Sequence, residues 1–81
     1  MTAQPRVEVL VRADCHLCEM ALEVVTEVCA ATGDAWTSTD IDSRPDLLEQ
    51  YTEQVPVTFV DGKQHDFWRV DPARLRAALT A

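Results

Sequence analysis

The stretch Asp14-Cys15-His16-Leu17-Cys18 follows an apolar run, Val7–Val11, and opens a segment whose apolar residues recur at helical spacing. Two cysteines three positions apart at the start of a helix place one sulfur near backbone N–H groups that have no partner within the helix. The other sulfur lies one turn further along, within bonding reach of the first. The spacing therefore predicts a redox dithiol on a turn between a strand and a helix, able to close and reopen a disulfide.

The two cysteines have different expected roles. A thiolate at the positive end of a helix dipole is stabilised, so Cys15 is the expected attacking residue. Cys18 is the expected resolving residue, because a neighbouring thiol can displace a mixed disulfide that the first has formed. A metal half-site is the alternative, but zinc needs four ligands, and only His16 and His65 could complete the set, without a recognisable spacing. We therefore predict no metal and no other cofactor.

Composition limits the classes of function. The chain has 81 residues, 47% of them apolar, which predicts a single domain over residues 1–81. Its formal net charge of −7 argues against a nucleic acid partner, which would require clustered Lys and Arg. No window approaches the ~20 apolar residues of a membrane span, and the first residues lack the layout of a signal peptide. We expect a cytoplasmic protein, and in that compartment a close cysteine pair is more often catalytic or metal-binding than structural.

Apolar patterning predicts four strands. Val7–Val11 is β-branched and nearly continuously apolar, which is typical of an interior strand covered on both faces. Residues 35–41 are half polar and suit an edge strand. Residues 57–60 and 64–68 flank Asp61-Gly62-Lys63, and an Asp-Gly turn between two such runs is a strong hairpin signal. We expect residues 1–5 to fray.

Capping residues and apolar stripes predict three helices. The first begins near Leu17 and ends at Gly33, a residue typical of a helix C-terminus. Ser43 is the expected N-cap of a short second helix. Asp71 before Pro72 predicts the start of the third. The resulting order is β-α-β-α-β-β-α, in which the first two strands are parallel and joined by a right-handed crossover.

Five further residues have both a functional and a plainer structural interpretation. Asp14 could cap the first helix, but its charge would oppose ionisation of Cys15. His16 could assist the thiolate, but a cation at a helix N-terminus is disfavoured, and it is interpreted as an exposed spacer. Cys29 lies near the apolar stripe of the first helix and is predicted to be a buried free cysteine that acts as a small hydrophobe. Phe67 and Trp68 either line a substrate groove or pack against the last helix, and packing is favoured.

With this order of elements and a Cys-x-x-Cys after the first strand, the chain resembles the thioredoxin superfamily, and within it the small glutaredoxin-like proteins. Three features carry the resemblance, which spans residues 7 to about 79: Cys15-His16-Leu17-Cys18, Val55-Pro56 before the third strand, and the Asp61-Gly62 hairpin. The resemblance implies an α/β fold of thioredoxin-like β-α-β-α-β-β-α order, with a four-stranded mixed sheet flanked by helices. It also implies a cis bond at Val55-Pro56 and exchange of thiols with disulfides.

The same resemblance implies which residues bind the substrate. The backbone of Val55 would lie beside the sulfurs and pair with an extended chain, which makes Val55 and Pro56 binding residues. Arg12 matches a basic residue that many glutaredoxins place near the thiolate and the glutathione carboxylate. Where many of these proteins hold glutathione with a glycine pair, this chain has Asp66-Phe67, whose side chains would keep the tripeptide backbone away.

The residues and the resemblance together predict a glutaredoxin-like thiol-disulfide oxidoreductase that acts in electron transport, with Cys15 attacking and Cys18 resolving. The expected partner is a disulfide-containing protein or a low-molecular-weight thiol, and the expected state is a monomer that binds neither nucleic acid nor a membrane. Two alternatives remain open. One is a non-catalytic binding module with the same fold, and the other is a metal or iron–sulfur cluster that two chains share through their cysteines.

Overall fold

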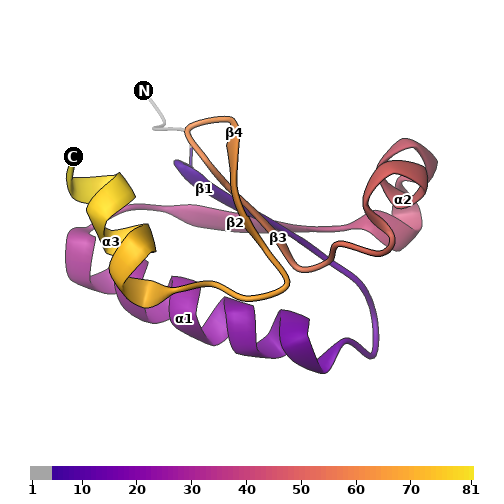
Figure 1. The fold of residues 1–81 in the computed structure, drawn as a ribbon, viewed down its shortest axis with the longest axis horizontal. Helices are drawn as coiled ribbons and strands as arrows, with labels where there is room; N and C mark the ends of the chain where they lie inside the picture. Colours follow the sequence, from indigo (N-terminus) through magenta and orange to yellow (C-terminus); the bar gives the residue numbers. More distant parts are fainter. Residues whose placement is uncertain (1–4) are drawn as a thin grey trace.

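Four strands form one mixed sheet in the order β2-β1-β3-β4 (Figure 1). Strands β1 (Val7–Val11) and β2 (Trp36–Asp40) are parallel, and β3 (Val57–Val60) is antiparallel to both β1 and β4 (Lys63–Phe67). This computed structural model describes residues 5–81, so the expectation for residues 1–4 lies outside the described part of the chain. The element order confirms the predicted α/β class and the thioredoxin-like β-α-β-α-β-β-α arrangement.

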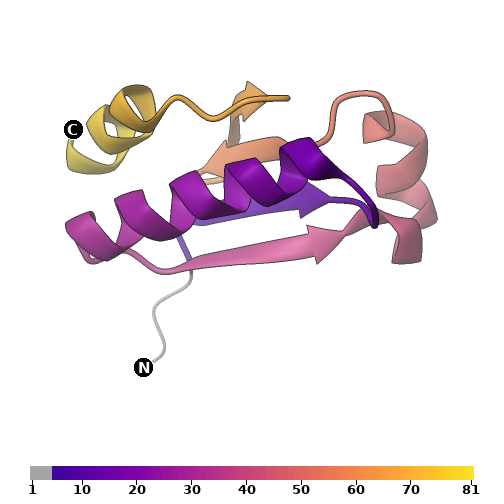
Figure 2. The same ribbon diagram turned by 90° about the horizontal axis from the view of Figure 1, so that it is seen from below.

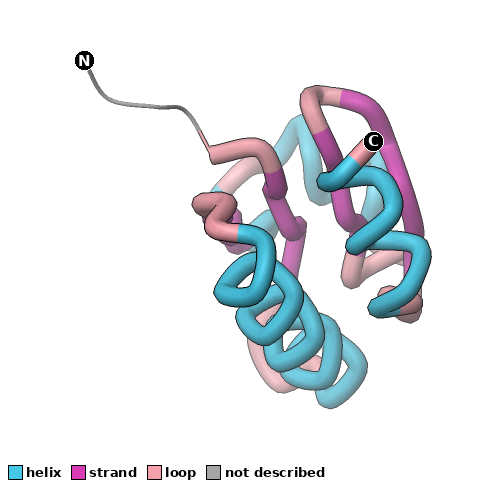
Figure 3. The backbone as a smooth tube through the Cα atoms, turned by 90° about the vertical axis from the view of Figure 1, so that its left-hand side faces the viewer, coloured by secondary structure: helices cyan, strands magenta, loops and turns pink. Residues whose placement is uncertain are grey.

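Helices cover both faces of the sheet, but unequally. Helices α1 (His16–Thr32) and α3 (Pro72–Thr80) lie against the same face and contact each other (Figures 1 and 3). The short helix α2 (Pro45–Tyr51) lies near one end of the sheet, and Figure 2 shows it at the opposite end of the molecule from α3. No helix within residues 5–81 is long and apolar enough to cross a membrane.

The alternation of side chains along β1 divides the core into two parts. Val7 and Val9 are fully buried with residues of α1 and α3, whereas Leu10 points to the other face and packs with Ile41 and Val57. Each such aliphatic side chain contributes about 1.5–3 kcal/mol when it is fully buried. This two-sided burial explains why the strand is nearly continuously apolar and confirms that it is interior.

The start of the second helix differs from the prediction. Ser43 closes a 3₁₀ turn, Ile41–Ser43, in which its hydroxyl donates to the carbonyl oxygen of Asp40 (2.9 Å). Helix α2 begins instead at Pro45, with Arg44 as an N-cap that makes no side-chain capping bond. Proline suits this position because its φ is preset and the first helical N–H has no partner within the helix.

The chain leaves the sheet one residue earlier than predicted, at Phe67. Trp68 lies outside β4 with φ 65°, and the side chains of Phe67 and Trp68 are 46% and 53% exposed. The predicted packing of these two aromatics against the last helix is therefore wrong. Val70 takes that place in the core with Leu75 and Leu79 of α3.

Candidate dithiol site

Cys15 is the N-cap residue of α1. Its backbone is extended (φ −110°, ψ 103°), and its sulfur accepts a hydrogen bond from the backbone N–H of Cys18 (3.2 Å). A side chain at this position normally satisfies one of the free N–H groups of the first helical turn, and here the sulfur does so. The predicted position of one sulfur at the helix start is confirmed. Asp14, the alternative cap, instead lies one residue outside the helix in the left-handed region (φ 56°).

The two sulfurs are joined in a disulfide and differ in access. The Cα atoms of Cys15 and Cys18 are 5.2 Å apart, within the ~4.4–6.8 Å that a disulfide spans. Cys15 is partly exposed, whereas Cys18 is only 2% exposed. Between them, the side chain of His16 is 83% exposed, which confirms its interpretation as an exposed spacer. An approaching molecule therefore meets the sulfur of Cys15 first.

The loop between α2 and β3 carries the second part of the site. The Val55–Pro56 peptide bond is cis, as the resemblance implied, and Pro56 is fully buried. Within residues 5–81, the backbone N–H and C=O of Val55 take part in no hydrogen bond. Because both groups need a partner once water is excluded, they are available to pair with an extended chain.

Arg12, the residue after β1, is hydrogen-bonded to the beginning of this loop. Its Nε donates to Asp42 Oδ1 (3.0 Å) and its Nη1 donates to Thr52 Oγ1 (2.8 Å), so the end of β1 is joined to the residue that follows α2. The guanidinium carries five N–H donors, of which these bonds use two. Its predicted contact with a substrate stays a prediction.

Trp68, one of the two aromatics considered for a substrate groove, is hydrogen-bonded to the loop that carries Val55. Its backbone N–H donates to the carbonyl oxygen of Pro56 (2.8 Å), and its indole Nε1–H donates to the carbonyl oxygen of Glu53 (2.9 Å). Its positive φ is one that residues with a Cβ rarely adopt. The glycine-like backbone after β4 is thus at Trp68, one residue beyond the Asp66-Phe67 pair that the resemblance had indicated.

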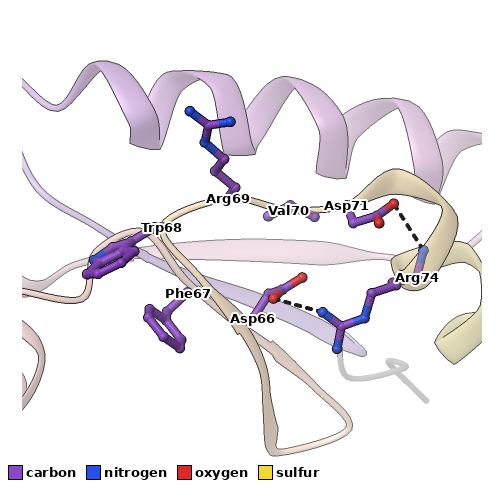
Figure 4. A pocket seen from close by; sticks show the side chains of 7 residues that line it. All are labelled: Asp66, Phe67, Trp68, Arg69, Val70, Asp71 and Arg74. Carbon is purple, nitrogen blue, oxygen red and sulfur yellow. Dashed lines mark hydrogen bonds and ion pairs between the residues drawn. The ribbon is translucent and has the colours of Figure 1, made fainter.

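Two cavities adjoin the segment after β4. The smaller, of about 130 Å³, lies between α1 and this segment and is lined by Leu17, Met20, Ala21, Val24, Trp68, Arg69 and Val70. The larger, of about 500 Å³, is lined by residues 66–71 and Arg74 (Figure 4). Its charges are partly paired, because Arg74 Nη1 donates to Asp66 Oδ1 (3.1 Å), while Arg69 points away from these groups toward α1.

The third cysteine is outside the site. Cys29 of α1 is a free cysteine and is 1% exposed in the hydrophobic core, as predicted. Burial raises the pKa of its thiol, and the nearby charge of Asp34 raises that pKa further.

No group of three or more His, Cys, Asp or Glu side chains in residues 5–81 is arranged to hold a metal ion. A cluster shared between two chains would take only Cys15 and Cys18 from each, and this alternative is therefore left open.

Several known proteins are similar to this chain in sequence and in fold. A family model described as "Glutaredoxin-like domain (DUF836)" matches residues 6–80. An uncharacterized protein of Mycobacterium tuberculosis is 34% identical over 82 residues, which cover 95% of this chain and 84% of that protein. An X-ray structure from X. campestris is 36% identical, covers 91% of this chain and 95% of its own, and has a TM-score of 0.76. A thioredoxin variant from Halobacterium salinarum is 28% identical, with 93% and 73% covered and a TM-score of 0.59.

Proposed function

The chain belongs to the glutaredoxin-like DUF836 family, and from this membership we propose that it is a thiol-disulfide oxidoreductase. The observation that carries the proposal is the Cys15–Cys18 disulfide at the start of α1. One sulfur is partly exposed and accepts a backbone N–H, and the other is buried one turn behind it. This arrangement supports an exposed nucleophile with a protected resolving thiol.

The proposed reaction transfers two electrons from the protein dithiol to a disulfide. The thiolate of Cys15 attacks one substrate sulfur, a mixed disulfide forms, and the other substrate sulfur leaves as a thiolate. Cys18 then loses its proton and attacks the sulfur of Cys15, which releases the second substrate thiol and closes the Cys15–Cys18 disulfide. Two cellular monothiols or one dithiol must supply two electrons to open that disulfide again. The step therefore belongs to an electron-transport chain of thiols.

The substrate is proposed to bind across the loop before β3. The N–H and C=O of Val55 have no partner among the described residues, so an extended peptide can add its own backbone there in the manner of an extra strand. Pro56 and Arg12 complete the proposed binding residues. Pro56 fixes the end of the loop, and Arg12 holds its beginning through Thr52.

The partner is proposed to be a disulfide-containing protein or a thiol other than glutathione. Close backbone approach to a small peptide requires positions without side chains. Where the resemblance places a glycine pair, this chain has Asp66-Phe67, and Trp68 follows; the two aromatics are about half exposed. We propose that the protein acts as a monomer in the cytoplasm, where other thiols keep its dithiol reduced.

The proposal is tested by single turnover with a peptide disulfide. Fully reduced protein should reduce about one disulfide per chain and end with Cys15 and Cys18 joined, as read by mass spectrometry. Cys15→Ser should reduce none, because Cys18 is buried. Cys29→Ala is the matched control and should behave as the unmodified protein does. If the reduced protein left the disulfide of the peptide unreduced, the result would favour the binding-module alternative.

A further inference from the structure

Trp68 is bonded to the substrate loop through both its backbone and its side chain. Its backbone N–H lies 2.8 Å from the carbonyl oxygen of Pro56 and 3.4 Å from that of Gln54, and its indole N–H lies 2.9 Å from that of Glu53. The three acceptors surround Val55, whose own N–H and C=O are free among the described residues. Trp68 thus fixes the backbone on both sides of Val55 without occupying the groups that a substrate would use.

Trp68 also lies beside the helix that carries the dithiol. Trp68 lines a cavity of about 130 Å³ together with Leu17 and Met20 of α1. Leu17 stands between the two cysteines in the sequence, and it and Met20 are 38% and 47% exposed. Trp68 is therefore hydrogen-bonded to the loop that presents Val55 and lines a cavity with the helix that presents Cys15.

The backbone of Trp68 indicates that this position is built by tertiary contacts. A φ of 65° is disfavoured for a residue with a Cβ, and most of all for a bulky one. The hydrogen bonds to the loop hold the residue there. Trp68 is also 53% exposed, so burial in the core does not account for this backbone conformation.

We propose that Trp68 is a positioning residue for polypeptide substrates. It holds the backbone around Val55 at a fixed place relative to Cys15, so that a peptide paired with Val55 has its disulfide at the attacking sulfur. This inference rests on the proposed oxidoreductase function and adds the substrate class to it. A small disulfide without a peptide backbone uses Cys15 but not Val55, and Trp68 should matter little for it.

The test compares two disulfides in three variants. Trp68→Phe keeps the ring but removes the indole N–H, Trp68→Gly adopts the positive φ without strain, and Trp36→Phe on β2 is the matched control. Loss of one hydrogen bond should raise KM for a peptide disulfide about two- to tenfold in Trp68→Phe, and more in Trp68→Gly, with kcat nearly unchanged. Neither variant should slow the reduction of bis(2-hydroxyethyl) disulfide, and Trp36→Phe should resemble the unmodified protein with both substrates.

The other outcomes would contradict either the positioning role of Trp68 or the oxidoreductase function. Equal effects on both disulfides, or an unchanged KM for the peptide, would overturn the positioning role while leaving the oxidoreductase function intact. If the unmodified protein reduced neither disulfide, the proposed oxidoreductase function would be wrong, and this inference would be wrong with it.

Hydrogen exchange gives a measurement that does not depend on activity. The backbone N–H of Gln54 donates to the carbonyl oxygen of Tyr51 (2.8 Å), next to the carbonyl groups that Trp68 holds. If Trp68 fixes the loop, this amide should exchange faster in Trp68→Phe than in Trp36→Phe. Equal exchange in the two variants would contradict the proposal.

Discussion

The expected reactivity of Cys15 comes from the backbone of α1 rather than from charged neighbours. The sulfur accepts the N–H of Cys18, at the end of the helix where the dipole favours a negative charge. The charges of Asp14, which precedes Cys15, and of Glu19 in the first turn would oppose ionisation. Arg12 directs its guanidinium to Asp42 and Thr52. The proposed activation of Cys15 therefore relies on the helix N-terminus rather than on a neighbouring cation.

If the N-terminus of α1 stabilises the thiolate, the pKa of Cys15 should be low in the reduced protein. In a Cys18→Ser, Cys29→Ser variant, we expect the single thiol to ionise below the ~8.5 of a free cysteine, because helix N-termini stabilise thiolates. Thiolate absorbance against pH measures this directly. A Cys15→Ser, Cys18→Ser variant is the control, since it retains only Cys29, whose pKa is raised by burial. Ionisation of Cys15 no earlier than ~8.5 would refute the proposed activation.

At this scale the sequence predicted what local spacing determines. The three-residue spacing of Cys15 and Cys18 is a local property, and so is the burial of Cys29 on the apolar stripe of α1. The conformation of Trp68 is not local, because its φ is held by hydrogen bonds to residues 53–56. A tryptophan in the left-handed region has no signature in its neighbours, so its role could be found only in the folded chain.

Elements were predictable where one residue enforces the backbone. Asp61 and Gly62 both have positive φ (52° and 82°), as a two-residue hairpin turn of matching twist requires, and the Asp-Gly pair announces this. Asp71 accepts hydrogen bonds from the first N–H groups of α3, also as predicted. The start of α2 was missed because Ser43 is used in a 3₁₀ turn, and Pro45 alone begins the helix.

Arg6 joins elements that are distant in the sequence. Its guanidinium makes a two-bond contact with Asp61 in the β3–β4 turn (2.9 Å each) and donates to the carbonyl oxygen of Leu79 in α3 (2.8 Å). The pair raises the pKa of Arg6 and lowers that of Asp61. The contact therefore holds the hairpin turn and the last helix to the start of β1, at the end of the sheet away from the dithiol.

The pH dependence of stability should reveal this contact. Because the pKa of Asp61 is lower in the folded chain than in the unfolded chain, the contact stabilises at neutral pH, and this contribution disappears as pH falls through the folded pKa. Asp61→Asn tolerates the positive φ but lacks the charge, so its Tm should lie below that of the unmodified protein at pH 7. The gap should close as the pH falls through the lowered pKa of Asp61, and it should also shrink at high salt because the pair is exposed. Glu27→Gln, an exposed change on α1, should show no such gap. A Tm difference that is constant with pH would show that the charge of Asp61 contributes nothing.

On the scale of the whole molecule, the proposed site draws on three segments that are far apart in the sequence. Cys15 and Cys18 follow β1, Val55 precedes β3 and Trp68 follows β4, and these three strands are neighbours in the sheet. Trp68 is hydrogen-bonded to the loop around Val55 and lines one cavity with Leu17 of α1. The sequence identified the first two segments by motif and by resemblance. Their connection through Trp68 depends on strand order and register, which no local pattern specifies.

Cys15 is proposed to attack the substrate and Cys18 to resolve the mixed disulfide, and trapping of that mixed disulfide tests these roles most directly. In an oxidised cell extract, Cys18→Ser should accumulate disulfide-linked adducts through Cys15, because the attack proceeds and the resolving step is missing. Cys15→Ser should trap few, since Cys18 is 2% exposed. Mass spectrometry of the adducts should find proteins or a thiol other than glutathione as the main partners. Rapid and preferential trapping of glutathione would contradict the proposed partner, and the absence of any adduct on Cys18→Ser would contradict the oxidoreductase mechanism itself.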